Sequence, residues 1–358
     1  MEPFRIHIPD EVLDDLRTRL RRTRWPDQVP GIGWKQGTDL EWLQRLVSHW
    51  ADRFNWRAWE DKLNALNHFT WDGIHFVHQR TASGRGVPLI LTHGWPSSFL
   101  DFIELLPRLA DFDVVVPSLP GYGFSPRPPQ VGVNYRYVAE RWHQLMIKLG
   151  YSRYSAAGYD FGAGVTTLLA LDHPESVIGI YITSLESDLT PVVNEAEVSD
   201  AERAYLEVNR AWDATERGYS AIQSTKPQTV GYGLNDSPAG LAAWIGEKWH
   251  SWSDVTPTDD FLCATLMLYW ATQTITSSMR DYWDNRWHPV DRVYVKTPTG
   301  FGVFAHQTVP EGEPPRSYLE RVYNIQRWTI FPRGGHFAPI ENPAAVAKDL
   351  TAFFHNLR

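Results

Sequence analysis

One acidic residue, Asp160, stands in a pattern that could position a nucleophile. It lies in the run Gly158-Tyr159-Asp160-Phe161-Gly162, between a strand-like segment at 154–157 and a helix-like segment at 165–171. A tight strand-to-helix turn lifts its central side chain above a sheet, and the residues two before and two after must be small because the backbone folds closely on itself. A carboxylate at that position attacks saturated carbon and forms an alkyl ester. The pattern therefore predicts ring opening or displacement of a leaving group, and argues against amide cleavage by a serine.

A second motif could stabilise negative charge beside that nucleophile. His93-Gly94-Trp95-Pro96 follows the strand-like segment 87–91. A loop in this place supplies one backbone N–H to an oxyanion, and the residue after the nucleophile supplies the other. We therefore predict an oxyanion hole formed by the N–H groups of Trp95 and Phe161, with His93 bracing the turn.

A third motif could supply a base. Gly334-Gly335-His336-Phe337 follows the last strand-like segment, 328–331. A histidine at this point of the chain could activate water against an Asp160 ester, so His336 is the predicted base. The 13 histidines and the single cysteine show no metal-ligand spacing, and we expect neither a metal nor another cofactor.

Composition limits the classes of partner. The 358 residues carry a net charge of −8, which gives no general attraction to nucleic acid. The one cysteine, Cys263, excludes an internal disulfide, and neither a signal peptide nor a run of about 18 apolar residues is present. We therefore expect a cytoplasmic protein without a membrane anchor.

The aromatic content is high, with 17 Trp, 15 Tyr and 16 Phe, and it suits a pocket for a lipophilic ligand. The assembly state stays open, with a homodimer as one candidate.

The elements that must position these residues fall into three blocks. Apolar residues recur at helical spacing in residues 1–70, which predicts an N-terminal helical extension. Short strands alternate with helices in residues 71–185, where one of the helices is expected at 99–109. Strands return in residues 291–358, the first of them at 291–295, and this alternation predicts an α/β core with a mostly parallel sheet. The intervening residues 186–290 are helix-like and rich in aromatic residues, and they predict a helical lid.

Together the motifs resemble the microsomal-type epoxide hydrolases. The resemblance rests on the Asp160 turn and on His93-Gly94-Trp95-Pro96-Ser97-Ser98, Pro120-Gly121-Tyr122-Gly123-Phe124-Ser125 and Gly334-Gly335-His336-Phe337-Ala338. The lid runs Gln223-Ser224-Thr225-Lys226-Pro227-Gln228-Thr229-Val230-Gly231 and Leu234-Asn235-Asp236-Ser237-Pro238 distinguish this branch from other α/β hydrolases. The resemblance covers nearly the whole chain. It departs at the start, where the membrane anchor of the mammalian enzymes has no counterpart in this sequence. It implies an α/β-hydrolase fold.

The resemblance also implies two lid tyrosines that hydrogen-bond the epoxide oxygen and protonate the leaving alkoxide. Tyr219 precedes the Thr-Lys-Pro run, and Tyr282 follows Ser278-Met279-Arg280-Asp281 near the end of the lid. These two positions match the family's tyrosines. Tyr294, after the lid, is the alternative to Tyr282.

The acid that should support His336 is the point of departure from the family. The family places a Glu or Asp shortly after Phe-x-x-Phe, whereas Phe301-Gly302-Val303-Phe304 is followed here by Ala305-His306-Gln307. A glutamine could orient the histidine ring but could not balance its charge. Three carboxylates remain as candidates, of which we select the first: Glu311, Glu313 and Glu186.

The resulting hypothesis is an enzyme that converts a small lipophilic epoxide and water to a vicinal diol through an Asp160 ester. A haloalkane dehalogenase shares the aspartate turn, but it commonly carries a Trp directly after the nucleophile to bind halide, and this chain has Phe161. A catalytically silent binding module is the other alternative, which loss of the acid at Gln307 would favour.

Overall fold

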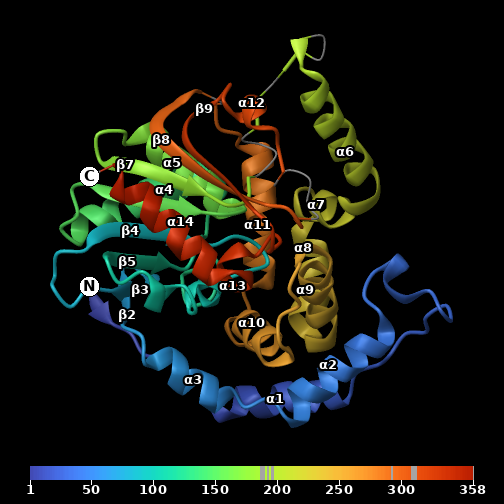
Figure 1. The fold of residues 1–358 in the computed structure, drawn as a ribbon. Helices are drawn as coiled ribbons and strands as arrows, with labels where there is room; N and C mark the ends of the chain where they lie inside the picture. The colour runs from blue at the N-terminus through green and yellow to red at the C-terminus, as the bar shows by residue number, and fades with distance from the viewer. Residues whose placement is uncertain (186–189, 192, 195–196, 292, 308–312, 358) are drawn as a thin grey trace.

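A nine-stranded sheet organises the part of the chain that the computed structural model describes, residues 1–185, 190–191, 193–194, 197–291, 293–307 and 313–357 (Figure 1). The strands are β1 (Glu2–Pro3), β2 (His68–Trp71), β3 (Ile74–Gln79), β4 (Val87–Thr92), β5 (Phe112–Pro117), β6 (Tyr154–Gly158), β7 (Val177–Ile182), β8 (Val295–Phe304) and β9 (Tyr323–Phe331). Their spatial order is β1-β2-β3-β5-β4-β6-β7-β8-β9. The first three strands pair antiparallel and the others parallel, which confirms the predicted, mostly parallel sheet.

The central strands are buried on both sides by helices. Nearly every residue of β4, β5 and β6 is apolar or small, as expected for parallel strands covered on both faces. Helices α4 (Tyr135–Lys148) and α5 (Phe161–Asp172) lie on one side of the sheet, and α13 (Ala338–Glu341) and α14 (Pro343–His355) lie on the other (Figure 1). Because neighbouring strands run parallel, the loops after β4, β6, β7, β8 and β9 meet at one edge, where such sheets bind ligands.

Within the described residues between β7 and β8, six helices form a layer, the lid, over that edge (Figure 1). They are α6 (Asp200–Glu216), α7 (Gly218–Gln223), α8 (Pro227–Asp236), α9 (Pro238–Trp252), α10 (Asp259–Thr272) and α11 (Ile275–Trp287). Ser199 begins α6 with a capping box in which its hydroxyl and the Glu202 side chain each accept from the other's backbone N–H. Helix α10 is buried from Phe261 to Trp270, because it packs between the other lid helices and the N-terminal segment.

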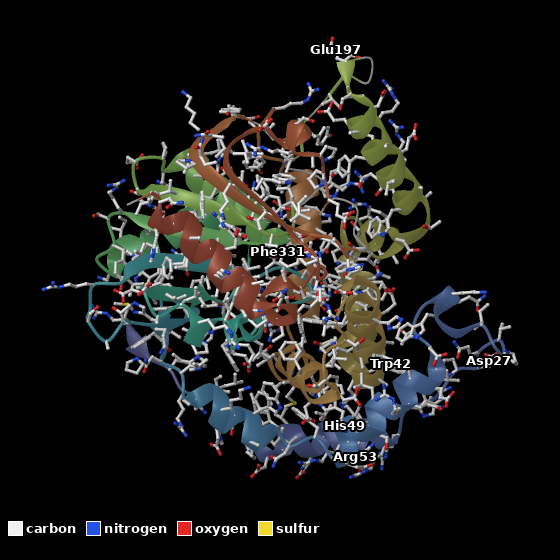
Figure 2. The ribbon with its side chains drawn as sticks, in the orientation of Figure 1. Asp27, Trp42, His49, Arg53, Glu197 and Phe331 are labelled. Carbon is white, nitrogen blue, oxygen red and sulfur yellow. The ribbon has the colours of Figure 1, made fainter. Side chains whose placement is uncertain are left out.

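The N-terminal segment packs against the lid as well as the core. Helices α1 (Asp10–Arg21), α2 (Leu40–Asp52) and α3 (Trp56–Asn64) run along the bottom of the view in Figure 1. The Thr38 hydroxyl donates to the Ala243 carbonyl of α9 at 2.7 Å, and Figure 2 shows Trp42 beside the same helix. A Cβ atom on Gly246 would lie 2.6 Å from the Trp42 ring, so glycine lets the two helices approach closely.

Three local features differ from the sequence-based expectations. The strand after the lid runs from Val295 to Phe304, whereas the sequence indicated 291–295. The predicted helix at 99–109 consists of two 3-10 turns, Phe99–Phe102 and Leu106–Arg108. Residues Glu2–Pro3 pair with β2, so the N-terminal segment also extends the sheet. Across the described ranges, no helix combines the length and the apolar character needed to cross a membrane.

Candidate active site

Asp160 occupies a strained turn between β6 and α5. Its backbone has φ 54° and ψ −131°, a conformation that L-residues rarely adopt outside functional sites. A Cβ atom on Gly158 would lie 2.3 Å from the Gly162 carbonyl oxygen, and one on Gly162 would lie 2.0 Å from the Thr92 oxygen. Only glycine fits at either position, which explains the small residues on both sides of the nucleophile.

The two predicted N–H donors converge on one oxygen of Asp160. The backbone N–H groups of Trp95 and Phe161 each donate to Oδ1 at 2.7 Å. A Cβ atom on Gly94 would lie 2.2 Å from the same oxygen, so the loop approaches the carboxylate as closely as its backbone allows. Asp160 is 2% exposed, and the positive amino end of α5 further stabilises its charge. Oδ1 is thereby fixed by two N–H donors, and Oδ2 is the oxygen that faces His336.

His336 faces that second oxygen. Its Nε2 lies 3.3 Å from Asp160 Oδ2, and the histidine is 2% exposed. The His336 loop is held by its own N–H, which donates to the Trp252 carbonyl at 2.9 Å, and by Glu341. The Glu341 carboxylate accepts from the N–H groups of Gly335 and Phe337 at 3.0 and 2.9 Å. The predicted nucleophile and the predicted base therefore share one buried site.

Ser184 and Gln307 lie on the other side of the imidazole. The Ser184 hydroxyl is 3.3 Å from His336 Nδ1, and the Gln307 amide donates to that hydroxyl at 2.8 Å. Glu313 is exposed, whereas His336 is buried. Glu311 and Glu186 lie outside the described residues. Sequence reasoning missed Ser184, because it follows β7 and meets His336 across 152 positions of the chain.

The lid brings both predicted tyrosines to the N–H donors. Tyr219, from α7, stacks on Trp95 with ring centres 5.6 Å apart and an 8° angle between the planes. Tyr282, from α11, contacts the Phe161 ring edge-on at 4.7 Å and lies 5.9 Å from the Tyr219 ring. Tyr294, the alternative, is 46% exposed and precedes β8.

Two buried groups behind these residues are structural supports. His93 accepts from the Leu119 N–H at Nε2, so its Nδ1 carries the proton and donates to the Gly94 carbonyl at 3.0 Å. Burial lowers the pKa of His93 to about 4, which keeps the ring neutral. The Tyr159 hydroxyl donates to Asp101, and burial raises the pKa of that carboxyl to about 7. No motif in the sequence pointed to Asp101.

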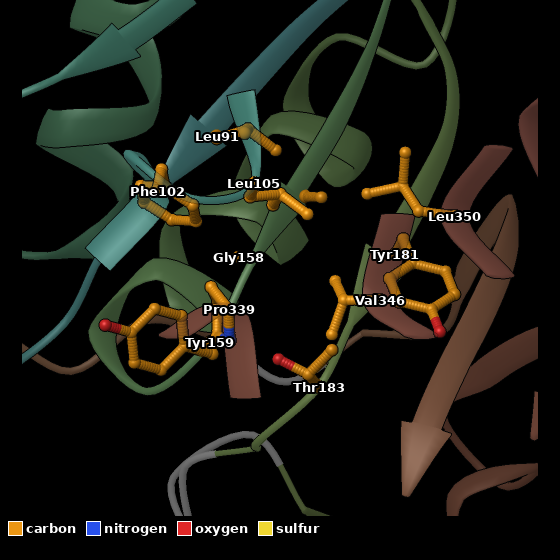
Figure 3. A pocket seen from close by; sticks show the side chains of 11 residues that line it. Leu91, Phe102, Leu105, Gly158, Tyr159, Tyr181, Thr183, Pro339, Val346 and Leu350 are labelled. Carbon is orange, nitrogen blue, oxygen red and sulfur yellow. The ribbon is translucent and has the colours of Figure 1, made fainter. Parts of the chain in front are cut away.

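A small apolar cavity lies behind the turn and does not reach the reacting atoms. It measures about 20 Å³ and is lined by carbon atoms of β4, β6, β7 and α14 (Figure 3). The Tyr159 hydroxyl points away from it. That volume is close to one water molecule, so this cavity is a packing void rather than a substrate site. Within the described ranges, no group of three or more His, Cys, Asp or Glu side chains is placed to hold a metal ion.

Comparisons with known proteins agree with the fold. Two family models match the chain: the epoxide hydrolase N terminus over residues 1–102 and the alpha/beta hydrolase fold over residues 87–300. A Stigmatella aurantiaca protein with a provisional epoxide hydrolase name is 38% identical over 99% of this chain and 85% of its own length.

Solved structures show the same architecture. The epoxide hydrolase of Aspergillus niger superposes with a TM-score of 0.90 at 30% identity, covering 100% of this chain and 96% of that one. The juvenile hormone epoxide hydrolase of Bombyx mori gives a TM-score of 0.91 at 30% identity, over 100% and 94% of the two chains. The chain is therefore an enzyme of the epoxide hydrolase family with the α/β-hydrolase fold.

Proposed function

We propose that this enzyme hydrolyses an epoxide to a vicinal diol in two steps, through an alkyl ester on Asp160. The observation that carries the proposal is the convergence of a fixed carboxylate, a histidine and two phenols. Oδ1 of Asp160 accepts two N–H groups at 2.7 Å, and the rings of Tyr219 and Tyr282 lie against the residues that donate them. Family membership favours this activity over a haloalkane dehalogenase or a silent binding module.

In the first step Oδ2 of Asp160 attacks an epoxide carbon. Oδ1 stays with the Trp95 and Phe161 N–H groups and becomes the carbonyl oxygen of the ester. The carbon–oxygen bond of the ring breaks, and its electron pair moves to the epoxide oxygen. An alkoxide is a poor leaving group, so a proton or a strong hydrogen bond from Tyr219 and Tyr282 is needed at that oxygen.

In the second step His336 removes a proton from water, which attacks the ester carbonyl. The negative charge that develops on Oδ1 remains with the same two N–H donors, which are already in place and need no reorganisation. Collapse of the tetrahedral intermediate breaks the bond between the carboxyl carbon and the former Oδ2, and the leaving alkoxide takes the proton held by His336, which releases the diol. The remaining carboxylic acid loses its proton to solvent, and the Asp160 carboxylate is restored. The donors therefore serve the nucleophile in one step and the oxyanion in the next.

For the group that balances the charge of His336, we propose Glu311, which follows Phe304 and Gln307 along the chain. The Ser184 hydroxyl, 3.3 Å from Nδ1, would orient the ring beside it. The substrate class is a small lipophilic epoxide, because the residues around Asp160 are mainly aromatic: Trp95, Phe161, Tyr219, Trp252 and Tyr282.

Trapping of the ester tests this proposal. With styrene oxide, His336→Gln should gain the mass of one epoxide on the Asp160 peptide and turn over no further, because water is not activated. Glu311→Gln should accumulate the same ester to a lesser extent. His355→Gln, a change on the C-terminal helix, is the matched control and should turn over normally. Absence of any adduct in folded His336→Gln, with the wild type active, contradicts the two-step route.

A further inference from the structure

A buried lysine lies over the ring of one predicted proton donor. Lys248, on α9, places its ammonium nitrogen 4.3 Å from the centre of the Tyr219 ring and 5.6 Å from that of Trp252. Its side chain is largely buried, and the residue as a whole is 7% exposed. An ammonium this close to an aromatic face is attracted by the electrons of the ring, and more strongly when water is excluded.

The only carboxylate paired with this lysine in the described ranges is its chain neighbour, Glu247. Glu247 also accepts from the Ser251 hydroxyl at 2.8 Å, which holds the carboxylate beside α9. The cation is thus partly balanced from one side, while its other side faces Tyr219.

Lys248 and Tyr219 share a cavity of about 980 Å³ between the N-terminal segment and the lid. Its other charged lining residues are Asp27, Lys35, Glu216 and Glu247. Towards the nucleophile, the titratable neighbours of Tyr219 are Tyr282, Asp160 and His336, reached through the Trp95 and Trp252 rings. Lys248 is the cation that directly contacts the tyrosine ring in the described part of the site.

We propose that Lys248 strengthens Tyr219 as the acid of epoxide opening, an inference that rests on the function proposed above. As Oδ2 of Asp160 bonds to carbon, the electron pair of the broken carbon–oxygen bond moves to the epoxide oxygen. The phenol proton of Tyr219 follows it, and negative charge develops on the phenol. The Lys248 ammonium stabilises that charge, and the proton returns to Tyr219 from water after the diol forms.

Substitutions at Lys248 and at its neighbour Glu247 should then have opposite effects on ring opening. Lys248→Met removes the cation but keeps an unbranched side chain, so proton donation should weaken and ring opening should slow about tenfold. Glu247→Gln removes the balancing anion while keeping an acceptor for Ser251, so ring opening should not slow. The alkaline limit of the ring-opening rate should move to higher pH in Lys248→Met and to lower pH in Glu247→Gln. Loosened packing would not produce shifts of opposite sign.

The test is single-turnover ring opening of styrene oxide from pH 6 to 10, followed by acid quench and measurement of the ester. Lys248→Arg keeps a cation and should stay within about threefold of the wild type. Lys35→Met removes a cation from the same cavity away from Tyr219 and should match the wild type. Far-ultraviolet circular dichroism checks that each variant is folded.

The outcomes separate the two proposals. A wild type that forms no ester overturns the proposed function, and this inference with it. A wild type that forms ester while folded Lys248→Met matches it in rate and pH profile overturns the role of Lys248 alone. If Lys248→Met does not fold, the pH profile of ring opening in Glu247→Gln decides the question. An alkaline limit that moves to higher pH, or does not move, overturns the proposal.

Discussion

At the scale of single residues, the proposed mechanism needs one oxygen of the Asp160 carboxylate to be fixed and the other to react. Trp95 and Phe161 hold Oδ1 of Asp160, and His336 faces Oδ2. The tyrosines are placed by ring contacts with those same donors. Shared contacts therefore position the proposed nucleophile, oxyanion donors and acids.

The tyrosines should act together in ring opening. Tyr219→Phe and Tyr282→Phe should each slow ester formation about tenfold, and the double variant about 100-fold or more, because the alkoxide loses its proton donors. The measurement is single-turnover ester formation with styrene oxide. Tyr294→Phe changes an exposed tyrosine and should leave the rate unchanged. Wild-type rates in the double variant would remove both tyrosines from the mechanism.

The buried Asp101 should make stability depend on pH. Its pKa is raised to about 7 by burial, against about 3.9 in an unfolded chain, so the folded state holds its proton more tightly. Ionisation of this buried carboxyl therefore lowers the free energy of unfolding. The loss is absent below about pH 4, grows as the pH rises to about 7, and reaches the order of 4 kcal/mol.

Asp101→Asn removes that titration and keeps an acceptor for Tyr159. Chemical denaturation should therefore show a larger gain, or smaller loss, in the free energy of unfolding at pH 8 than at pH 5, relative to the wild type. An identical difference at both pH values would show that Asp101 does not titrate in this range.

At the scale of elements, the turn between β6 and α5 requires glycine for steric reasons. Gly162→Ala should lower the free energy of unfolding by about 2–3 kcal/mol, because its Cβ would lie 2.0 Å from the Thr92 backbone oxygen, which cannot move aside. Gly233→Ala is the matched control. It lies exposed in α8 with no atom within 4 Å of a new Cβ, so alanine should stabilise the helix by about 0.5–1 kcal/mol. Urea denaturation measures the free energy of unfolding of both variants. An equal change in Gly162→Ala and Gly233→Ala would contradict the steric explanation.

The same elements show what sequence could predict. The turn that carries Asp160 could be predicted, because the glycine spacing and the preceding strand that define it lie within a few residues of each other in the sequence. Strand β8 was placed too early, since Pro298, Gly300 and Gly302 weaken the strand pattern and its pairing with β7 and β9 decides the outcome. Ser184 had no local signal, because its contact with His336 depends on two loops that are distant in sequence. The predicted domain boundaries, the homodimer and the cytoplasmic location stay predictions.

At the scale of the whole molecule, the N-terminal segment acts as a brace for the lid. Thr38 and Trp42 contact α9, the helix that carries Lys248, and Arg19 pairs with Asp236 at the end of α8 at 2.8 Å. Figure 2 shows Trp42 and His49 on the side of this segment that faces the lid. The position of α9, and with it Lys248, therefore depends on contacts that span the chain, since Thr38 and Ala243 are 205 positions apart.

Trp42→Ala should loosen the lid without touching the reacting atoms. Losing a half-buried indole against α9 should cost about 2 kcal/mol in the free energy of unfolding and speed amide hydrogen exchange in α9. Trp25→Ala removes a tryptophan that is 37% exposed. It should lower the free energy of unfolding less than Trp42→Ala and should leave amide exchange in α9 close to that of the wild type. Exchange in α9 that is as slow in Trp42→Ala as in the wild type would refute the bracing role.

The central claim is that Asp160 forms a covalent ester that water then cleaves at the carboxyl carbon. A single turnover of styrene oxide in ¹⁸O-labelled water, followed by mass analysis of the Asp160 peptide, tests it most directly. The account predicts heavy oxygen in the Asp160 carboxylate, because the attacking water becomes one of its two oxygens. An active enzyme whose Asp160 stays unlabelled, with the label passing straight into the diol, would contradict it.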